Sequence, residues 1–223
     1  MAAAHGAYCA ACLIEEALAP IDTGVRNSTS EADDKRRRGT RHVTIQMPLG
    51  QSPSASVFLV KAEGPPLRLL RLKTWSRPAP AGFLSRFHQL QVRLEEWASE
   101  GVVPLLAASV DASGCPSVLS EFRQGVPVLD RVRSGRLDPE EAIACLTRLR
   151  ALANSAHDRG LIHGSIVPGN VIVHPDSASA YLLDFGVAPL LSSPGNDVAC
   201  ASADLVGFAE LAQMVRAAAT GRL

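Results

Sequence analysis

The order of hydrophobic and polar residues predicts strands in the first half of the chain. Apolar and polar positions alternate, as in half-buried strands, in three runs: HVTIQM (42–47), SVFLVKA (56–62) and LRLLRLKTW (67–75). Two more strands are predicted on either side of a turn at 111–116. Between these groups, residues 83–98 carry an apolar stripe at helical spacing, which consists of Phe83, Phe87, Leu90, Leu94 and Trp97. This half is therefore expected to be a sheet with one helix.

The second half has the periodicity of helices. The strongest helix is predicted over 139–158. Asp138 can cap it, Pro139 suits the first helical position and Glu141 completes a capping box. Its apolar face consists of Ile143, Leu146, Leu149, Ala153 and Ala156. Short strands are predicted around VIV (171–173) and YLLDF (181–185), and a last helix over 204–219. The fold class predicted from both halves is α+β.

The first 40 residues differ from the rest of the chain. Residues 1–19 can form a short helix, whereas residues 20–40 are polar and charged without an apolar period, which is typical of a flexible segment. The pattern therefore divides the chain into a flexible N-terminal segment (1–40), a strand-rich part (41–121) and a helix-rich part (122–223).

Charge and cysteine content narrow the classes of function. The 22 basic residues balance 22 acidic ones, so net charge gives no argument for binding nucleic acid. The five scattered cysteines suggest no disulfide framework, and Cys9 and Cys12 lack the second pair that would complete a zinc site. No apolar run approaches the roughly 20 residues that cross a bilayer, and no secretory signal is evident. We expect a cytoplasmic protein with no nucleic-acid partner and no membrane segment.

Two motifs with chemical potential lie in the strand-rich half. LGQSPSASV (49–57) is a turn of small residues, with Gly50 near its start and Val57 at its end. LRLK (70–73) ends on Lys73, one of only three lysines in the chain. A glycine lets the backbone approach phosphates closely, and a lysine is a compact cation that holds them.

Two further motifs lie in the helix-rich half. HGSIVPGN (163–170) ends on Asn170, and it is followed by the triplet Asp184-Phe185-Gly186. Amide and carboxylate oxygens are suitable hard ligands for Mg²⁺. Asn170 and Asp184 are therefore the candidate metal ligands.

In this order and at these distances, the four motifs resemble those of a bacterial-type serine/threonine protein kinase, over about residues 42 to 223. The resemblance implies a bilobal fold, with a strand-rich N-lobe and a helical C-lobe that is truncated here after its central helix. It also implies that ATP and Mg²⁺ bind between the lobes. The positions implied to contact the nucleotide are Leu49, Gly50, Val57, Lys73, Glu121, Phe122 and Ile172.

The chain departs from the kinase pattern where phosphoryl transfer takes place. Ser165 stands at the position of the Asp that accepts the substrate's hydroxyl proton, and Val167 at that of the Lys that steadies the transferred group. A serine is a poor general base at neutral pH. The helix Glu that pairs with the strand Lys would fall near Leu90, whereas Glu95 and Glu96 come more than one turn too late.

The end of the chain departs from the pattern as well. The segment between Asp184 and the last helix is short, and no A-P-E motif follows. The buried Asp that the family carries in this helix would fall on Gly207 by counting back from Gly221, with Asp204 as a shifted candidate.

The sequence therefore predicts a pseudokinase that binds ATP and Mg²⁺ and acts as a regulatory or scaffolding module, with Lys73 and Ser165 at the catalytic positions. Two alternatives stay open: an active serine/threonine protein kinase, and a fragment that does not fold stably. We also expect a protein partner or self-association through the incomplete C-lobe, whose last helix carries Leu205, Phe208, Leu211, Met214 and Val215.

Overall fold

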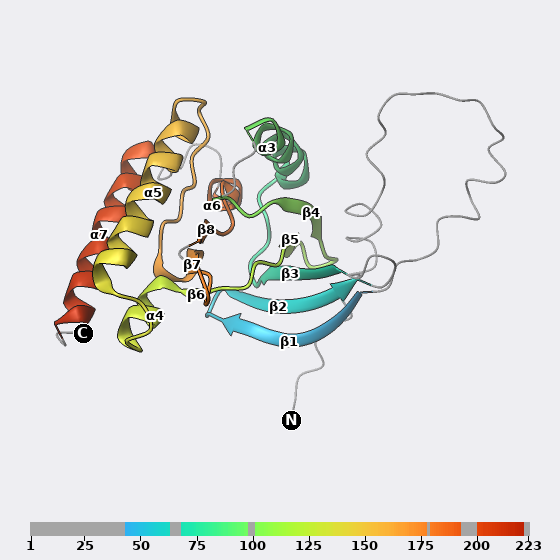
Figure 1. Cartoon of the computed structure of the whole chain (residues 1–223). Helices are drawn as coiled ribbons and strands as arrows, with labels where there is room; N and C mark the ends of the chain where they lie inside the picture. Colours follow the sequence, from blue (N-terminus) through green and yellow to red (C-terminus); the bar gives the residue numbers. More distant parts are fainter. Residues whose placement is uncertain (1–42, 63–67, 98–100, 178, 193–199, 221–223) are drawn as a thin grey trace, which may run out of the picture. The chain divides into compact units, whose positions relative to one another are not determined.

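The structure, a computed structural model, describes residues 43–62, 68–97, 101–177, 179–192 and 200–220 (Figure 1). The predicted flexible segment, its short helix and the Cys9–Cys12 pair lie outside these residues. Internal contacts divide the chain into two compact units. The first unit comprises Met1–Pro78 and Leu106–Glu121, and the second comprises Ala79–Leu105 and Phe122–Leu223. The predicted division at residues 40 and 121 stays a prediction.

The first unit is built on a five-stranded sheet with the strand order β1-β2-β3-β5-β4. Its strands are β1 (Val43–Gln51), β2 (Ala55–Ala62), β3 (Arg68–Trp75), β4 (Leu105–Val110) and β5 (Pro116–Glu121). β1, β2 and β3 pair antiparallel in sequence order, and β3 also pairs antiparallel with β5. The five strands predicted from alternation are thus confirmed.

One face of this sheet forms the core of the first unit. Its buried side chains are Val60, Ala62, Leu70, Leu72, Ala107 and Leu119. Leu70 and Leu72 are two residues apart on β3, so they point to the same face. The residues between and beside them, such as Arg71 and Lys73, therefore point to the other face.

The second unit contains most of the helices and a small sheet. Its longer helices are α3 (Phe83–Trp97), α5 (Pro139–His157) and α7 (Ala201–Ala219). Its three-stranded antiparallel sheet has the order β6-β7-β8, formed by β6 (Val126–Pro127), β7 (Val171–Val173) and β8 (Ala180–Leu182). Sheets and helices together confirm the predicted α+β class.

Helices α5 and α7 lie side by side in the second unit (Figure 1). The predicted cap of α5 is present, because the Asp138 carboxylate accepts hydrogen bonds from the backbone N–H groups of Glu140 (2.8 Å) and Glu141 (3.3 Å). Four of the five residues predicted for its apolar face are buried, and Ile143 packs against the same core while partly exposed. The main core of the unit forms between these helices, β7 and Phe185.

Several short elements were not predicted. They are α4 (Val128–Arg133), α6 (Val187–Leu191), the 3₁₀ turn Pro168–Asn170 and the two-residue strand β6. Each is too short for a hydrophobic period to stand out. Helix α7 begins at Ala201, three residues before the predicted start. The start was missed because the residue before it is Cys200, which is not a strong capping residue.

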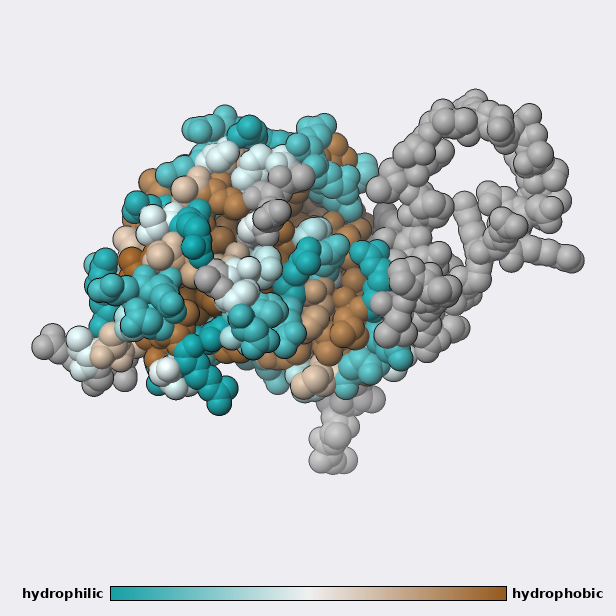
Figure 2. Space-filling view, viewed as in Figure 1, coloured by the Kyte–Doolittle hydropathy of each residue, from teal (hydrophilic) through white to brown (hydrophobic). Residues whose placement is uncertain are grey.

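Hydrophilic and hydrophobic side chains both occur on the surface. Hydrophilic side chains cover much of the face seen in Figure 2, and hydrophobic ones reach the surface between them. Exposed apolar residues are common in folded proteins, and here they include Ile45 and Met47 on β1. No helix of the described ranges is long and apolar enough to cross a membrane.

Gly207 allows α7 to approach the loop before β7. A Cβ atom at this position would lie 2.7 Å from the carbonyl oxygen of Ile166 and 2.8 Å from its Cβ. Real Cβ atoms do not make contacts this short, so any larger residue here must push the loop away. Gly207 therefore fixes the distance between the helix and the segment that carries Ser165.

We predict that Gly207→Ala destabilises the protein by about 1–2 kcal/mol, even though alanine is favoured over glycine in helices by about 1 kcal/mol. The reason is that overpacking against backbone costs more than the helix gains. Gly169→Ala is the matched control, since nothing lies within 4 Å of its added Cβ. Urea denaturation of both variants checks this, and equal stability of the two would contradict it.

Candidate functional site

The centre of the candidate site is a loop that the carboxylate of Asp204 holds in place. Asp204 lies in the first turn of α7 and is 1% exposed. Its oxygens accept hydrogen bonds from the backbone N–H groups of His163 (2.9 Å) and Gly164 (2.8 Å). A third bond joins it to Nε2 of His157, at 2.9 Å. The buried carboxylate thus connects α7, the end of α5 and the loop between α5 and β7.

This arrangement decides between the two positions considered for the buried Asp. Asp204 holds the loop, whereas Gly207 packs against Ile166 of the same loop. The position found by counting back from Gly221, which is Gly207, was therefore wrong. The buried Asp lies about one helical turn earlier, at Asp204. Sequence reasoning missed His157, whose only signal is that it lies near the end of the predicted helix, shortly before His163.

Three rings pack in a row from α3 to this loop. Trp97 and Phe185 have ring centroids 5.5 Å apart, and Phe185 meets His163 edge-on at 5.1 Å. Phe185 and His163 are fully buried. Edge-on and tilted contacts are favourable for aromatic rings. The row connects helix α3 to the loop that Asp204 holds.

His163 is kept neutral by this environment. Burial lowers the pKa of its imidazole to about 4, although the nearby carboxylates of Asp204 and Asp184 act in the opposite direction. Its Nδ1 accepts a hydrogen bond from the backbone N–H of Ser165 at 3.2 Å, which places the ring hydrogen on Nε2. The ring therefore serves as an uncharged part of the core that fixes the backbone at Ser165.

Ser165 and Asn170 are bound to one another across the loop. The Asn170 Nδ2 group donates to the Ser165 carbonyl oxygen at 2.9 Å and to the Ser165 Oγ at 3.3 Å. Asn170 is 7% exposed. Because its amide nitrogen is directed at Ser165, Oδ1 is the side-chain atom that Asn170 can offer to a cation. Val167, by contrast, exposes 45% of its surface.

Asp184 lies in a tight turn that is tied to the same loop. Its φ angle is +58°, in the left-handed region that Asp enters more readily than most residues. The Leu183 N–H donates to the Asn170 carbonyl oxygen (2.9 Å), and the Gly186 N–H donates to that of His163 (3.2 Å). Two backbone hydrogen bonds therefore hold the Asp184 turn against the Asn170 loop.

The donor set of Asn170 and Asp184 fits Mg²⁺ better than a transition metal. Both offer oxygen atoms, which hard cations prefer. The described residues contain no group of three or more His, Cys, Asp or Glu side chains that could hold a metal ion. A cation at this position would accordingly need oxygen ligands from another molecule, as Mg²⁺ bound to substrate phosphates has.

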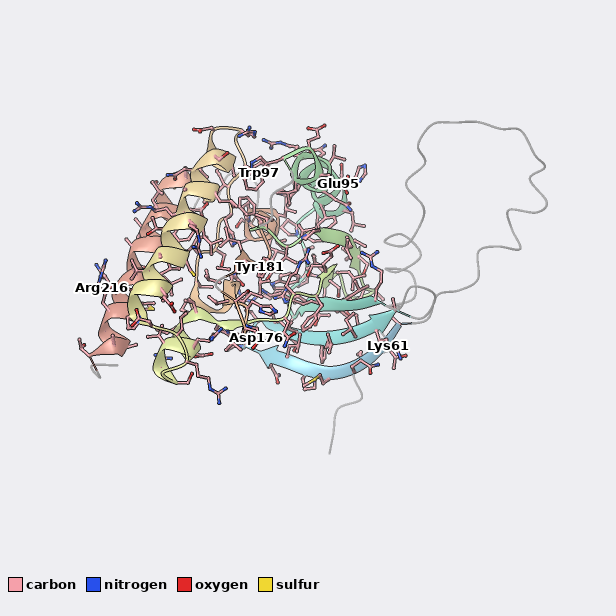
Figure 3. The ribbon with its side chains drawn as sticks, in the orientation of Figure 1. Lys61, Glu95, Trp97, Asp176, Tyr181 and Arg216 are labelled. Carbon is pink, nitrogen blue, oxygen red and sulfur yellow. The ribbon has the colours of Figure 1, made fainter. Side chains whose placement is uncertain are left out.

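Helix α3 does not provide a carboxylate near this turn. Leu90 packs there instead: its Cδ1 atom lies 2.7 Å from where a Cβ of Gly186 would be. Gly186 has a φ of +74°, a conformation that favours glycine, and Leu90 leaves little room beside it. Glu95 and Glu96 are exposed on α3, while Trp97 on the same helix is partly buried (Figure 3).

The remaining candidates of the second unit are Phe122 and Ile172. Phe122 follows the last strand of the first unit and is partly exposed. Ile172 lies on β7 opposite Tyr181 and is 6% exposed, packed with Val103 and Leu183. The loop, the Asp184 turn and Ile172 thus belong to one unit.

In the first unit, the predicted nucleotide-binding residues pair with one another across neighbouring strands. Gly50 pairs with Val57 across β1 and β2, and Val57 pairs with Lys73 across β2 and β3. Leu49 lies beside Gly50 and is exposed. The Lys73 ammonium lies over the Trp75 ring, 5.1 Å from its centroid. The two motifs of this unit are therefore neighbours in the sheet, as the sequence could not show.

The end of β5 is the last candidate position of the first unit. Glu121 pairs with Leu70 in the ladder, and its carboxylate accepts a hydrogen bond from Arg68 at 3.4 Å. This pair is partly exposed to solvent, so it contributes little to stability. The backbone of Glu121 continues directly into Phe122.

No protein-family model matches the chain. It is similar in sequence to the serine/threonine-protein kinase PknB of Mycobacterium tuberculosis, with 29% identity over 104 residues, which are 46% of this chain and 16% of PknB. It is also similar to the serine/threonine-protein kinase PkaB of Streptomyces coelicolor, with 28% identity over 167 residues, 71% of this chain and 39% of PkaB.

A shorter match is to the serine/threonine-protein kinase PknD of Mycobacterium tuberculosis, with 39% identity over 61 residues, 27% of this chain and 9% of PknD. The chain thus spans well under half of the length of each of these relatives.

We predict that His163 makes the protein less stable in acid. The imidazole has a pKa of about 6.5 in an unfolded chain and about 4 in the folded one. The unfolded state therefore takes up the proton first, and stability falls as the pH drops from about 6.5 to about 4, by roughly 3 kcal/mol. Above pH 6.5 His163 has no such effect. Urea denaturation between pH 7.5 and pH 4.5 measures this.

The control for this prediction is His163→Phe, which keeps a ring against Phe185 but cannot titrate. It should be less stable at pH 7.5, because the Ser165 N–H loses its acceptor, and it should lose less stability on acidification than the wild type. Identical pH profiles for the two proteins would show that His163 is not the responsible group.

Proposed function

We propose that this chain, which is protein-kinase-like by its similarity to bacterial serine/threonine protein kinases, is a pseudokinase that binds ATP with Mg²⁺ and acts as a regulatory or scaffolding module. The observation that carries the proposal is at Ser165. The position that should accept the substrate's proton holds a hydroxyl, and this hydroxyl is within hydrogen-bond distance of the Asn170 amide.

The groups that would bind the nucleotide and its metal are present. Lys73 can hold phosphate oxygens, and Asn170 and Asp184 offer oxygen ligands. A bound Mg²⁺ would neutralise charge on the phosphates. Asn170 and Asp184 are both buried and held by the backbone bonds between their segments, so they would meet a ligand without first being ordered.

The groups that would act on the transferred phosphoryl are absent. Ser165 carries no charge, and its hydroxyl oxygen already holds its proton at neutral pH, so it is a poor acceptor for the substrate's proton. Val167 is an exposed apolar side chain at the position of the family's lysine. A positioned general base contributes about 10²- to 10⁴-fold to a reaction rate, and the lost cation removes charge stabilisation as well.

A further group is missing on α3. Active kinases need the strand lysine to be paired with a helix glutamate, and here Leu90 packs against Gly186 while Glu95 and Glu96 are exposed. The departures concern proton transfer, phosphate charge and the helix position that carries the family's glutamate. Such losses compound, because phosphoryl transfer depends mainly on positioning and electrostatics.

We predict that the wild-type chain transfers no phosphate from radiolabelled ATP to a generic basic protein, and that Ser165→Asp alone restores little or nothing. The carboxylate would return one proton acceptor but leave Val167 and Leu90 unchanged. Asp184→Ala is the control for transfer that depends on the metal site. Transfer by the wild type that Asp184→Ala abolishes would favour an active serine/threonine kinase instead.

We also propose that the chain associates with a second copy through the outer side of α7. Phe208, Leu211 and Val215 belong to the buried core, so they cannot form this surface. Leu205 is 40% and Val206 55% exposed, and Ala209 lies one turn further on. The net charge of the chain is zero, so a second copy meets little electrostatic repulsion, which favours self-association.

We predict concentration-dependent self-association in sedimentation velocity experiments, and its weakening by Val206→Glu, which places a charge in the apolar patch. Ala144→Glu adds the same charge at an exposed position of α5 and should leave the association unchanged. A monomer at all concentrations, or equal behaviour of the two variants, would contradict this assignment.

A further inference from the structure

The second unit contains a surface pocket of about 480 Å³, and none of the residues that line it belongs to the candidate site. One wall of the pocket is a face of α5, formed by Cys145, Arg148, Leu149 and Leu152. Residues three, four and seven positions apart lie on the same face of a helix. Pockets of roughly 300–1,000 Å³ hold small molecules in other proteins, so this one has room for a small ligand.

The facing wall is formed by the start of β8, the turn before it and the residue at position 101. These lining residues are Ser179, Ala180, Tyr181 and Gly101. A Cβ atom at Gly101 would lie 2.7 Å from Cδ1 of Leu152. The glycine therefore lets this segment come close to α5, which closes the pocket on the side of the two leucines.

Arg148 brings a positive charge to the pocket. Its Nη2 atom donates a hydrogen bond to the Cys145 Sγ at 3.2 Å. Burial raises the pKa of the Cys145 thiol, although Arg148 opposes the shift, so the thiol is neutral at pH 7 and does not cancel the charge of the guanidinium. The other charged groups that act on this thiol are Glu141 and Arg131, one of each sign. The polar end of the pocket therefore favours an anion.

The guanidinium of Arg148 can be reached from water. Arg148 is exposed on α5, whereas Cys145 beside it is 1% exposed. Arg148 also takes part in a further interaction. A guanidinium carries five N–H donors in a planar fork, so a carboxylate can replace water on its exposed side while the bond to Cys145 stays in place.

We propose that this pocket binds a small monocarboxylic acid with an apolar body. Its carboxylate would accept hydrogen bonds from Arg148, and its body would pack against Leu149 and Leu152. A guanidinium matches a carboxylate in shape and charge. Arg148 is the one charged side chain among the eight lining residues that the structure describes, which fits a monoanion better than a phosphate dianion. This site is separate from the nucleotide site proposed above and does not depend on it.

The test compares dissociation constants of phenylbutyrate and its neutral amide, phenylbutyramide, by ligand-observed NMR titration of the whole chain. The wild type should bind the acid at least about threefold tighter than the amide, which is what an exposed ion pair contributes. Arg148→Met keeps most of the length but removes the charge, so it should bind the two probes alike. Ala180→Leu adds bulk to the opposite wall and should weaken both.

Arg150→Met is the matched control, because it removes the same charge from an exposed position of the same helix that does not line the pocket. It should keep the preference for the acid, and saturating ATP with Mg²⁺ should change neither constant. The inference is overturned if the wild type binds neither probe or shows no preference. It is also overturned if Arg148→Met keeps the preference, if Arg150→Met loses it, or if ATP displaces the acid. The two arginine variants decide the matter even if Ala180→Leu does not fold.

Discussion

The buried carboxylate of Asp204 is the interaction on which the candidate site depends. Removing a carboxylate from water is costly unless hydrogen bonds replace its hydration, and here two backbone N–H groups and His157 supply them. Those bonds can form only if α5, α7 and the loop at His163 adopt one arrangement. The positions of Ser165 and Asn170 then follow from the backbone that Asp204 holds, and the Asp184 turn follows from its two hydrogen bonds to the same loop.

Periodicity predicted the long elements well, because their cores are large enough to impose a period. The face of α5 and the alternation of β3 are examples. The short elements α4 and α6 escaped, since one or two turns carry no period. The role of Asp204 was ambiguous, because counting along a chain cannot reveal which residue of a helix meets a loop. His157 was missed for the same reason: its role comes from its contact with Asp204, which is distant in sequence.

The residues proposed to bind the ligand and those proposed to have lost a reactive role differ in their surroundings. Asn170 and Asp184 are buried and tied to the backbone of neighbouring segments. Val167 lies at the surface, and Ser165 is partly buried with one side-chain contact to Asn170. The residues proposed to bind the metal are thus buried, whereas Val167 lies at the surface and Ser165 is partly buried.

His163 and Ser165 differ in what a mutation at each position would affect. The neutral imidazole of His163 fills the core against Phe185 and accepts a bond from the backbone of Ser165. A mutation at His163 would disturb this packing whether or not the protein catalyses a reaction. A mutation at Ser165 would instead remove the side-chain hydrogen bond from Asn170. In the proposed pseudokinase, core packing would therefore keep a ring at the first position, whereas only catalysis would call for an Asp at the second.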